Sequence, residues 1–587
     1  MATLYVDYKN GNDAGTGATG DPLKTLAHTL SAHAGNNDTI LCRGSDATDE
    51  IYQEYGFATA LTGLTIAADT GHTPTWTPAT AYTSWALTAG QSFTYETAFT
   101  PAACWYCLNG STSLLVKASI AEVEATENTF YADVAGDKLY VHIAGGGAPT
   151  SIRAWSSVDG LLTSAGANIT YSGLRCQWCG CGFAINAAAT VTNCTVRYHG
   201  GAYFGSRNCI QITTSSAVVI SGCTISGQLG TVNGSRGIYL DLANAVVSIS
   251  NTVFSDLFTG IRDNATATVT VDSCTMSNII DGVTLYKALA GSVIRYCTFS
   301  NFGHGAVQLA ETTNAVVHHN IAYFAGSNTH HNTYICETGA TGLFYHNVAY
   351  GLESASGNGF GFYIKENAST ATVYNNIAQD CKIGYHQDAT PTLTTDYNCA
   401  YGCATAYLDW VEGAHGITDD PEFVDAANAD FHLSATSPCL DTGVAIAGIN
   451  DGYCGTAPDI GRFEALAAAL VGAWSGAGAT AKATAKTMAG AWLASGVLTR
   501  NAGKAVSGAW AGAGGLARAV TKPLSGAWSG AGAVARAIAK LVAGVWSGIG
   551  GMSSTNTVVA DNRACLTVSD TPVLTMTASD AGACSTT

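Results

Sequence analysis

One short phrase recurs along the middle of the chain, and no other feature constrains the fold as strongly. It centres on a Cys, Thr or Asn followed by strand-forming residues, and successive copies lie 22 to 29 residues apart. The copies are NCTV at 193–196, GCTIS at 222–226, NTVFS at 251–255, SCTMS at 273–277, YCTFS at 296–300, HNIAY at 319–323, HNVAY at 346–350, NNIAQ at 375–379 and YNCAY at 397–401.

Each copy follows an alternating strand such as ATVTVDS, and most units carry a further strand after a turn, such as GVTLYK or GFYIKE. Three short strands per unit, joined by turns of irregular length, indicate a solenoid whose rungs pair with the rungs above and below. The sequence therefore predicts an all-β fold, a right-handed parallel β-helix with rungs from about Ile169 to Ala400. The 67 Gly and the low share of charged residues, 11%, agree with β structure rich in tight turns.

The same repeat explains many of the 19 cysteines. The central position of the phrase is cysteine in four units, at Cys194, Cys223, Cys274 and Cys297, and asparagine in the last four. A small apolar thiol fits a stacked interior column, so we expect these cysteines to be buried and reduced. Zinc binding is the alternative for two other groups, Cys176, Cys179, Cys181 and Cys104, Cys107. Neither group has a second Cys or His pair at zinc-finger spacing, so packing is favoured and no metal site is predicted.

A solenoid needs capped ends, because an open rung exposes unpaired backbone groups. The segment DPLKTLAHTLSAHAG at 21–35 predicts an amphipathic helix that covers the first rung, with Asp21 as N-cap and Pro22 at the first helical position. The chain then divides into an N-terminal strand and capping helix (1–51), an irregular β region or inserted β domain (52–165), the β-helix (166–418), its closing segment (419–465), a repeat tail (466–552) and a short β segment (553–587).

Both ends of the solenoid carry distinctive motifs. LYVDYKNGNDAGTGATGDPLKTL opens the chain, and DDPEFVDAANADFHLSATSPCLDTG at 419–443 is followed by APDIGRFEA at 457–465. Together they resemble a broad family of right-handed β-helix repeat proteins, with a pectate-lyase-like solenoid and an ending of the form SPCxDxG then DIGxFE. The resemblance covers about Thr3 to Ala465 and implies the fold. The family includes phage structural proteins, bacterial surface proteins and polysaccharide-processing enzymes, so it does not select a function.

A different repeat follows, with a tryptophan every 18 residues at Trp474, Trp492, Trp510, Trp528 and Trp546. Eighteen residues make five helical turns, but each repeat carries two or three glycines that disfavour a helix. Small residues alternate with larger ones, which favours β structure, and a flexible Ala/Gly-rich linker is the remaining alternative. A single repeat cannot bury its tryptophan, so we expect the tail to oligomerise or to attach the chain to another protein.

Charge separates this tail from the rest of the chain. The formal net charge is −17, yet residues 465–552 carry eight Lys or Arg and no Asp or Glu, which leaves −25 for the remainder. A net negative surface disfavours a nucleic-acid partner. No secretory signal and no apolar run long enough for a membrane span is visible, which predicts synthesis in a host cytoplasm and argues against a bacterial surface adhesin.

Charged residues gather at one strand end of successive units. Aligning the GVTLYK-type strands places Lys287, Glu311, Glu337 and Glu366 in one column, with Lys365 beside it. Rungs lie ~4.8 Å apart, so Glu311 and Glu337 would have the spacing of a retaining glycosidase. The alternative is a solvated charge ladder without catalytic use. Histidines before these strands and tyrosines within them would form a glycan-binding face of His304, His330, His331, Tyr334 and Tyr363.

These features predict a structural or adhesive bacteriophage virion protein, a tail fibre, tailspike or head-attached fibre that presents its β-helix to host-surface carbohydrate. We expect a homo-oligomer, a trimer in preference, joined to other virion proteins through the C-terminal repeats. The alternative is a polysaccharide lyase or glycosidase. No cofactor is expected, except that a lyase would need a cation such as Ca²⁺ or a basic side chain to neutralise a uronate.

Overall fold

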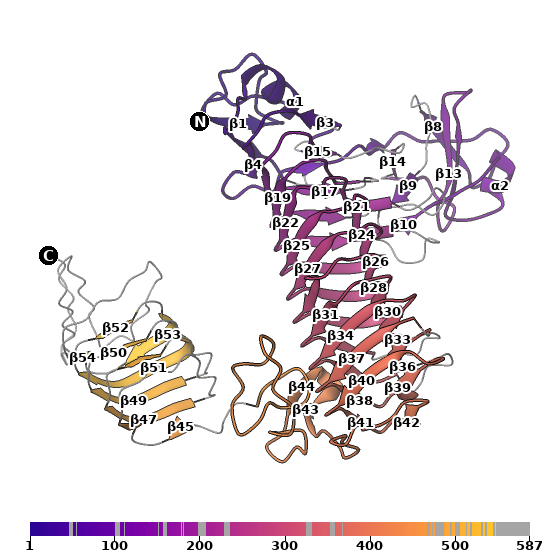
Figure 1. The fold of residues 1–587 in the computed structure, drawn as a ribbon. Coiled ribbons are helices and arrows are strands. Elements are labelled where there is room, and N and C mark those ends of the chain that lie inside the picture. The colour runs from indigo at the N-terminus through magenta and orange to yellow at the C-terminus, as the bar shows by residue number, and fades with distance from the viewer. Residues whose placement is uncertain are drawn as a thin grey trace. The chain divides into compact units, whose positions relative to one another are not determined.

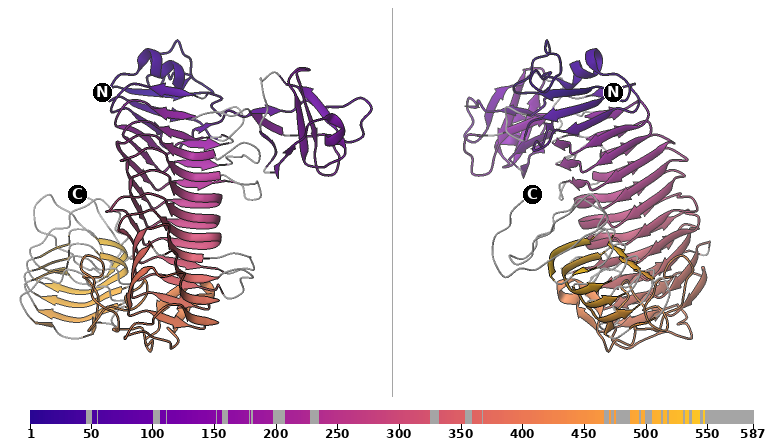
Figure 2. Two further views of the ribbon diagram at one scale, coloured as in Figure 1. Left: turned by 45° about the vertical axis from the view of Figure 1, so that its right-hand side comes forward. Right: turned by 90° about the vertical axis from the view of Figure 1, so that its left-hand side faces the viewer.

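Equivalent residues of successive repeats lie side by side in two long parallel sheets. The fold is a right-handed parallel β-helix of about 13 turns (Figures 1 and 2). The computed structural model describes residues 1–45, 51–54, 56–99, 106–110, 112–150, 152–155, 161–177, 179, 181–197, 207–227, 235–324, 332–352, 359–366, 368–465, 470–471, 474–475, 487–493, 496–498, 505–511, 514–516, 519–529, 532–534, 537–543 and 546–547.

Sheet 1 takes one strand from each rung, 13 in the described part of the chain. Its strands in spatial order are β1 (Thr3–Asp7), β2 (Thr39–Arg43), β4 (Thr65–Ala68), β16 (Ile169–Ser172), β19 (Ala189–Thr192), β22 (Ala217–Ser221), β25 (Val246–Ser250), β27 (Thr268–Asp272), β29 (Val293–Arg295), β31 (Ala315–His318), β34 (Thr341–Tyr345), β37 (Thr370–Tyr374) and β40 (Thr392–Asp396).

Sheet 2 holds the remaining strands of the rungs. These are β3 (Phe57–Thr59), β5 (Thr75–Trp76), β15 (Leu162–Ser164), β17 (Arg175–Gln177), β18 (Phe183–Ile185), β20 (Thr195–Arg197), β21 (Arg207–Ile212), β23 (Thr224–Ser226), β24 (Ser235–Leu240), β26 (Val253–Asp263), β28 (Thr275–Leu285), β30 (Thr298–Ala310), β32 (Ile321–Tyr323), β33 (Asn332–Glu337), β35 (Val348–Tyr350), β36 (Phe360–Ile364), β38 (Ile377–Gln379), β39 (Ile383–Gln387), β41 (Cys399–Tyr401) and β42 (Thr405–Leu408).

The recurring phrase encodes the corner between the two sheets. The residue before its central Cys, Thr or Asn has a left-handed backbone in every copy, at Asn193, Gly222, Asn251, Ser273, Tyr296, His319, His346, Asn375 and Tyr397. None of these residues is β-branched, as expected for a positive φ. The turn directs the next side chain into the interior and restarts the chain as a strand of sheet 2.

The interior column that follows this corner is confirmed. Cys194, Cys223, Cys274 and Cys297 are all at most 2% exposed. Burial raises the pKa of the Cys223 thiol to about 11 and raises that of Cys194 further. All four are free thiols in the structure.

Asparagines continue the column as a hydrogen-bonded ladder. Asn347 Oδ1 accepts from the backbone N–H of Asn320 at 3.1 Å and from its Nδ2 at 3.0 Å. Asn376 Oδ1 accepts in the same way from Asn347, and Asn398 Oδ1 from Asn376. A buried amide is tolerated here because its donors and acceptor are satisfied by neighbouring rungs.

The solenoid begins earlier than the sequence-based boundary at 166. In parallel register, β1 pairs with β2, β2 with β4, and β4 with β16. The capping helix is also shorter than predicted. It begins at Leu26 (α1, Leu26–His28, continued by the π-helical turn η1, Thr29–His33), and Thr25, not Asp21, is the N-cap. The chain is still paired as a strand at Leu23, whose N–H donates to Tyr5, and this delays the helix.

Residues 80–155 form an inserted domain with its own core. One sheet contains β6 (Thr80–Tyr82), β9 (Tyr106–Asn109), β10 (Thr112–Ser113) and β14 (Ile152–Trp155). The other contains β7 (Ala86–Leu87), β8 (Tyr95–Ala98), β11 (Leu115–Val116), β12 (Thr129–Asp133) and β13 (Lys138–His142), with the helix α2 (Ile120–Glu124) nearby. The core includes Phe99, Phe130, Leu139 and Ile152, each at most 1% exposed.

The closing segment contains a two-stranded sheet of β43 (Phe423–Asp425) and β44 (Asp430–Leu433), joined by the 3₁₀ turn η2 (Ala426–Asn428). Gly461 N–H donates to Asn375 O at 2.8 Å. The Arg462 guanidinium donates to the carbonyl oxygens of Cys297 and Tyr296 at 3.1 and 3.0 Å. The DIGRF motif therefore satisfies backbone groups along the corner column.

The C-terminal repeats form a second compact unit together with parts of the closing segment, residues 433–436, 440–459 and 464–587. The prediction of β structure is confirmed, because neighbouring strands are parallel with an 18-residue register that aligns the backbone of Trp492, Trp510 and Trp528. Residues 553–587 lie outside the described residues. The strands are β45 (Leu470–Val471), β46 (Trp474–Ser475), β47 (Thr487–Leu493), β48 (Gly496–Leu498), β49 (Ala505–Ala511), β50 (Gly514–Leu516), β51 (Ala519–Ser529), β52 (Gly532–Val534), β53 (Ala537–Ala543) and β54 (Trp546–Ser547). Within the described residues, no helix has the length and apolar character needed to cross a membrane.

Candidate functional site

The outward face of sheet 2, from β24 to β39, concentrates aromatic and ionisable side chains. Side chains alternate along a strand, so the residues between two buried positions point away from the core. Ile238 and Leu240 of β24 are both fully buried, as are Phe362 and Ile364 of β36. The residues between them share one register position from rung to rung, namely Tyr239, Arg262, Thr284, Gln308, Ile335, Tyr363 and His386. Neighbouring side chains cover three of them, because Thr284, Ile335 and Tyr363 are only 3%, 2% and 7% exposed. We call this row the outer column.

A connected group of side chains lies at the later rungs of the outer column. Lys365 Nζ is 3.0 Å from Glu337 Oε2, and Gln308 Nε2 donates to Glu337 Oε1. The Lys365 ammonium also lies 5.8 Å from the centre of the Tyr363 ring. Glu337 is therefore held between a cation and an amide from the rungs on either side.

The Tyr363 ring continues this group toward the next rung. Its hydroxyl donates to Asp388 Oδ2 at 3.3 Å, and its ring stacks on the His386 ring with centroids 4.9 Å apart. Burial and the charge of Asp388 raise the pKa of Tyr363 to about 12, so the phenol stays protonated at neutral pH. These residues, Gln308, Glu337, Lys365, Tyr363, His386 and Asp388, are called the polar cluster below.

A histidine–aspartate pair lies beside the polar cluster. His304 Nδ1 is 2.9 Å from Asp281 Oδ1. The pKa of His304 is raised above its usual value, first by this hydrogen bond and in part by the charge of Glu337, while burial and Lys365 act in the opposite direction. The raised pKa favours the protonated imidazole paired with Asp281, and a histidine held in this way has the chemistry of a general acid.

The earlier rungs add a second aromatic and basic group to the same face. The Arg236 guanidinium lies 4.4 Å from the centre of the Tyr239 ring, and Tyr239 donates to Asp241 at 3.3 Å. One rung further, Arg262 lies 5.6 Å from the Tyr286 ring. Burial and the neighbouring Arg262 lower the pKa of Arg236, although a guanidinium remains charged at neutral pH.

The predicted charge column is only partly correct. Lys287 and Glu311 do form an exposed ion pair at 3.7 Å. However, Glu337 pairs in register with Ala310, one residue before Glu311, so the two carboxylates do not occupy one column as predicted. Glu311 has already left its strand with a φ of 52°, and Glu366 is likewise in a left-handed turn, with a φ of 68°.

The structure brings together only part of the residue set predicted to form a glycan-binding face. Tyr334 is fully buried, stacks on Phe362 at 4.9 Å and donates to Val348 O, so its assignment to an outward face is wrong. Tyr363 belongs to the polar cluster, and His304 lies beside it. His330 and His331 lie outside the described residues.

Residues that the sequence analysis missed include Asp281, Gln308, His386, Asp388 and Arg262. The alternation of the strand GAVQLAE could have found Gln308, because it lies between the buried Val307 and Leu309 and therefore faces outward. Among the described residues, no group of three or more His, Cys, Asp or Glu is arranged to hold a metal ion. Cys176, Cys179 and Cys181 are buried, and burial raises the pKa of Cys176 and Cys179.

Comparison with known proteins agrees with the fold. Residues 208–421 match the family model described as the right-handed β-helix region. No curated protein matches the chain.

Solved structures are similar only at low identity. The complex structure of XylC with xylose is 12% identical, with 72% of this chain and 87% of that chain covered and a TM-score of 0.45. Pectate lyase Pel9A is 11% identical, with 79% and 96% covered and a TM-score of 0.39. The tailspike gp61 of Pseudomonas phage phi297 is 10% identical, with 62% and 71% covered and a TM-score of 0.23.

Proposed function

We propose that this protein binds an extended glycan along the outward face of sheet 2. The polar cluster carries the proposal, because it places an aromatic ring, an ammonium, carboxylates and an amide next to one another on consecutive rungs. Sugars present apolar C–H faces that pack on rings and hydroxyls that bond to polar groups, and this mixture suits them. A polymer along the solenoid axis meets a new rung every ~4.8 Å, so contacts add up along its length.

The setting we propose is a bacteriophage virion, with the protein as a tail fibre, tailspike or head-attached fibre that contacts host-surface carbohydrate. The C-terminal repeats support this proposal. They form a separate stack of parallel strands with a basic composition, unlike the acidic solenoid, which suits a module that oligomerises or attaches to other virion proteins. A homotrimer is the assembly we propose.

Glycan binding is tested by titrating the full-length protein with purified bacterial surface polysaccharides in biolayer interferometry. Replacing Tyr363 with alanine removes the ring at the centre of the polar cluster, and we expect about tenfold weaker binding or more. Tyr453→Ala is a matched control, because Tyr453 is 37% exposed and lies outside sheet 2. Equal effects of the two variants, or no binding by the wild type to any glycan from a confirmed host, would contradict the proposal.

A polysaccharide lyase or glycosidase is the second candidate, and the His304–Asp281 pair beside Glu337 favours it. A lyase would release unsaturated uronates, seen by absorbance, and a glycosidase would release reducing ends. If the protein is such an enzyme, His304→Gln and Glu337→Gln should lower the rate by about 10²-fold or more while glycan binding persists. Glu311→Gln is the control, because that carboxylate lies in an exposed ion pair outside the column. Product formation that neither substitution reduces would exclude these residues from catalysis.

A further inference from the structure

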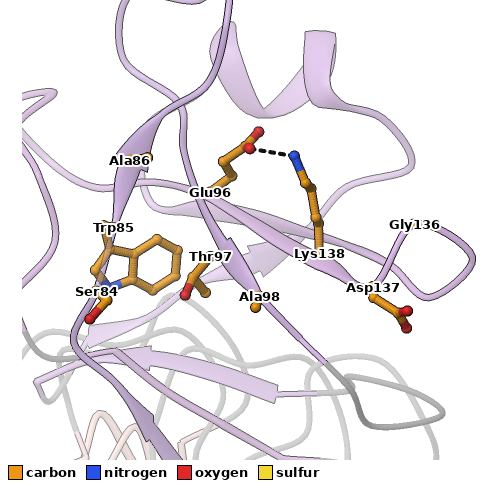
Figure 3. Close-up of a pocket in the computed structure, with 9 residues that line it drawn as sticks. All are labelled: Ser84, Trp85, Ala86, Glu96, Thr97, Ala98, Gly136, Asp137 and Lys138. Atoms are coloured by element: carbon orange, nitrogen blue, oxygen red, sulfur yellow. Dashed lines mark hydrogen bonds and ion pairs between the residues drawn. The ribbon is translucent and has the colours of Figure 1, made fainter.

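The inserted domain carries a pocket of about 480 Å³ that lies outside the solenoid face described above. Its walls come from the segment leading into β7, from β8 and from the turn between β12 and β13 (Figure 3). The lining residues are Ser84, Trp85, Ala86, Glu96, Thr97, Ala98, Gly136, Asp137 and Lys138. The volume falls in the range of small-molecule sites, about 300 to 1,000 Å³.

Trp85 supplies an aromatic wall of fixed orientation. Its indole Nε1 donates to Tyr82 O at 3.0 Å, and its ring packs against the domain core, so the ring does not need to be ordered by a ligand. Figure 3 shows the ring next to Thr97 of β8, and the ion pair joins Glu96 of β8 to Lys138 of β13. The indole N–H is already bonded, which leaves the ring carbons as a surface for an apolar partner.

The polar groups of the pocket favour a neutral ligand rich in hydroxyls. Glu96 and Lys138 are paired, and the ion pair raises the pKa of Lys138, so its ammonium stays charged and neutralises Glu96. Asp137 remains as an exposed carboxylate in a left-handed turn, with a φ of 52°. Carboxylates accept hydrogen bonds from hydroxyl groups but repel a second carboxylate, so a uronate is disfavoured.

We propose that this pocket is a second carbohydrate site, which binds a neutral mono- or disaccharide unit against Trp85. Ala86 and Ala98, two residues with small side chains, line the pocket together with Trp85. The pocket and the polar cluster share no residues, so an experiment can disprove binding at one site without disproving binding at the other. Two sites on one chain would raise the apparent affinity for a polymer that reaches both.

The test uses the full-length chain in isothermal titration calorimetry with cellobiose, lactose and N,N′-diacetylchitobiose as neutral probes and digalacturonate as the acidic probe. At least one neutral disaccharide should bind, and Trp85→Ala should weaken it about tenfold or more. Trp85→Phe, which keeps a ring, should weaken it less. Ala98→Trp should block the pocket without removing a core contact, because Ala98 is exposed. This second variant still tests the pocket if the Trp85→Ala protein does not fold.

Two controls separate this site from the solenoid. Leu115→Ala removes a side chain that is 51% exposed in the same domain but outside the pocket, and it should leave binding unchanged. Tyr363→Ala should leave disaccharide binding in the pocket unchanged while it weakens binding of a long glycan. The proposal is overturned if no neutral disaccharide binds, if digalacturonate binds better, or if neither Trp85→Ala nor Ala98→Trp reduces binding.

Discussion

The asparagine ladder allows a stability effect to be worked out from individual hydrogen bonds. Asn347 is fully buried, and its Oδ1 is the partner of the Asn320 backbone N–H in the structure. Its Nδ2 donates to Val317 O at 2.8 Å and to Asn376 Oδ1 at 3.0 Å. Asn347→Ala removes all of these contacts from the middle of the column and adds no new partner for the groups left behind.

The expected cost follows from these contacts. Leaving a buried N–H without a hydrogen-bond partner lowers the free energy of unfolding by about 1 to 3 kcal/mol. Losing a hydrogen bond whose remaining group keeps another partner lowers it by about 0.5 to 1.5 kcal/mol. For Asn347→Ala we therefore expect a loss of ~3 to 5 kcal/mol in the free energy of unfolding. Asn428→Ala is the control. Asn428 is exposed and its amide donates to Asp425, so the change should stay within about 0.5 kcal/mol.

The assay is urea unfolding of the full-length variants, followed by the circular dichroism of the β structure. The Asn347→Ala transition should move to clearly lower urea with a similar slope, since the unfolded surface is unchanged. A loss below about 1 kcal/mol, or an equal loss in Asn428→Ala, would refute the account of the ladder as a source of stability.

Three further predictions concern acid stability, thiol burial and assembly. Burial lowers the pKa of His318 to about 4 and that of His319 to about 2. The stability that depends on their neutral forms is therefore present above pH ~6.5 and is lost as the pH falls toward 4. The urea midpoint should drop over that pH window, and it should drop less in His319→Asn. Cys274 should react with iodoacetamide slowly in the native state and quickly in urea, and Cys274→Ser should destabilise by ~1 to 3 kcal/mol because it buries a hydroxyl. Deleting the residues after Ala465 should leave a soluble β-helix that immunoblots do not detect in purified particles, whereas normal incorporation would show that the repeats are not the attachment module.

The register of the rungs could be predicted from the sequence because it depends on local chemistry. The corner of each rung needs a left-handed residue followed by a small or amide side chain, and the phrase repeats that requirement at Cys223, Cys297 and Asn347 alike. Interior position follows from the same few residues. The stacked rungs and their buried column could therefore be predicted without a structure.

The candidate site could be predicted less well, because it depends on where each strand ends. Glu311 and Glu337 look equivalent in the sequence, but the register offset of one residue moves one of them out of the column. Tyr334 and Tyr363 both lie in apolar strands, and only the pairing of β33 with β36 shows that they face opposite sides. A shift of one residue reverses the face of a strand residue, and irregular turns leave that shift open.

The central claim is that a glycan lies on the outward face of sheet 2, and a cryo-electron microscopy map of the protein saturated with its bound polysaccharide tests it most directly. We predict density for sugar rings against Tyr363 and within hydrogen-bond distance of Lys365 and Glu337, extended across consecutive rungs. Bound polysaccharide found only on another surface, with no sugar in contact with the polar cluster, would contradict the account.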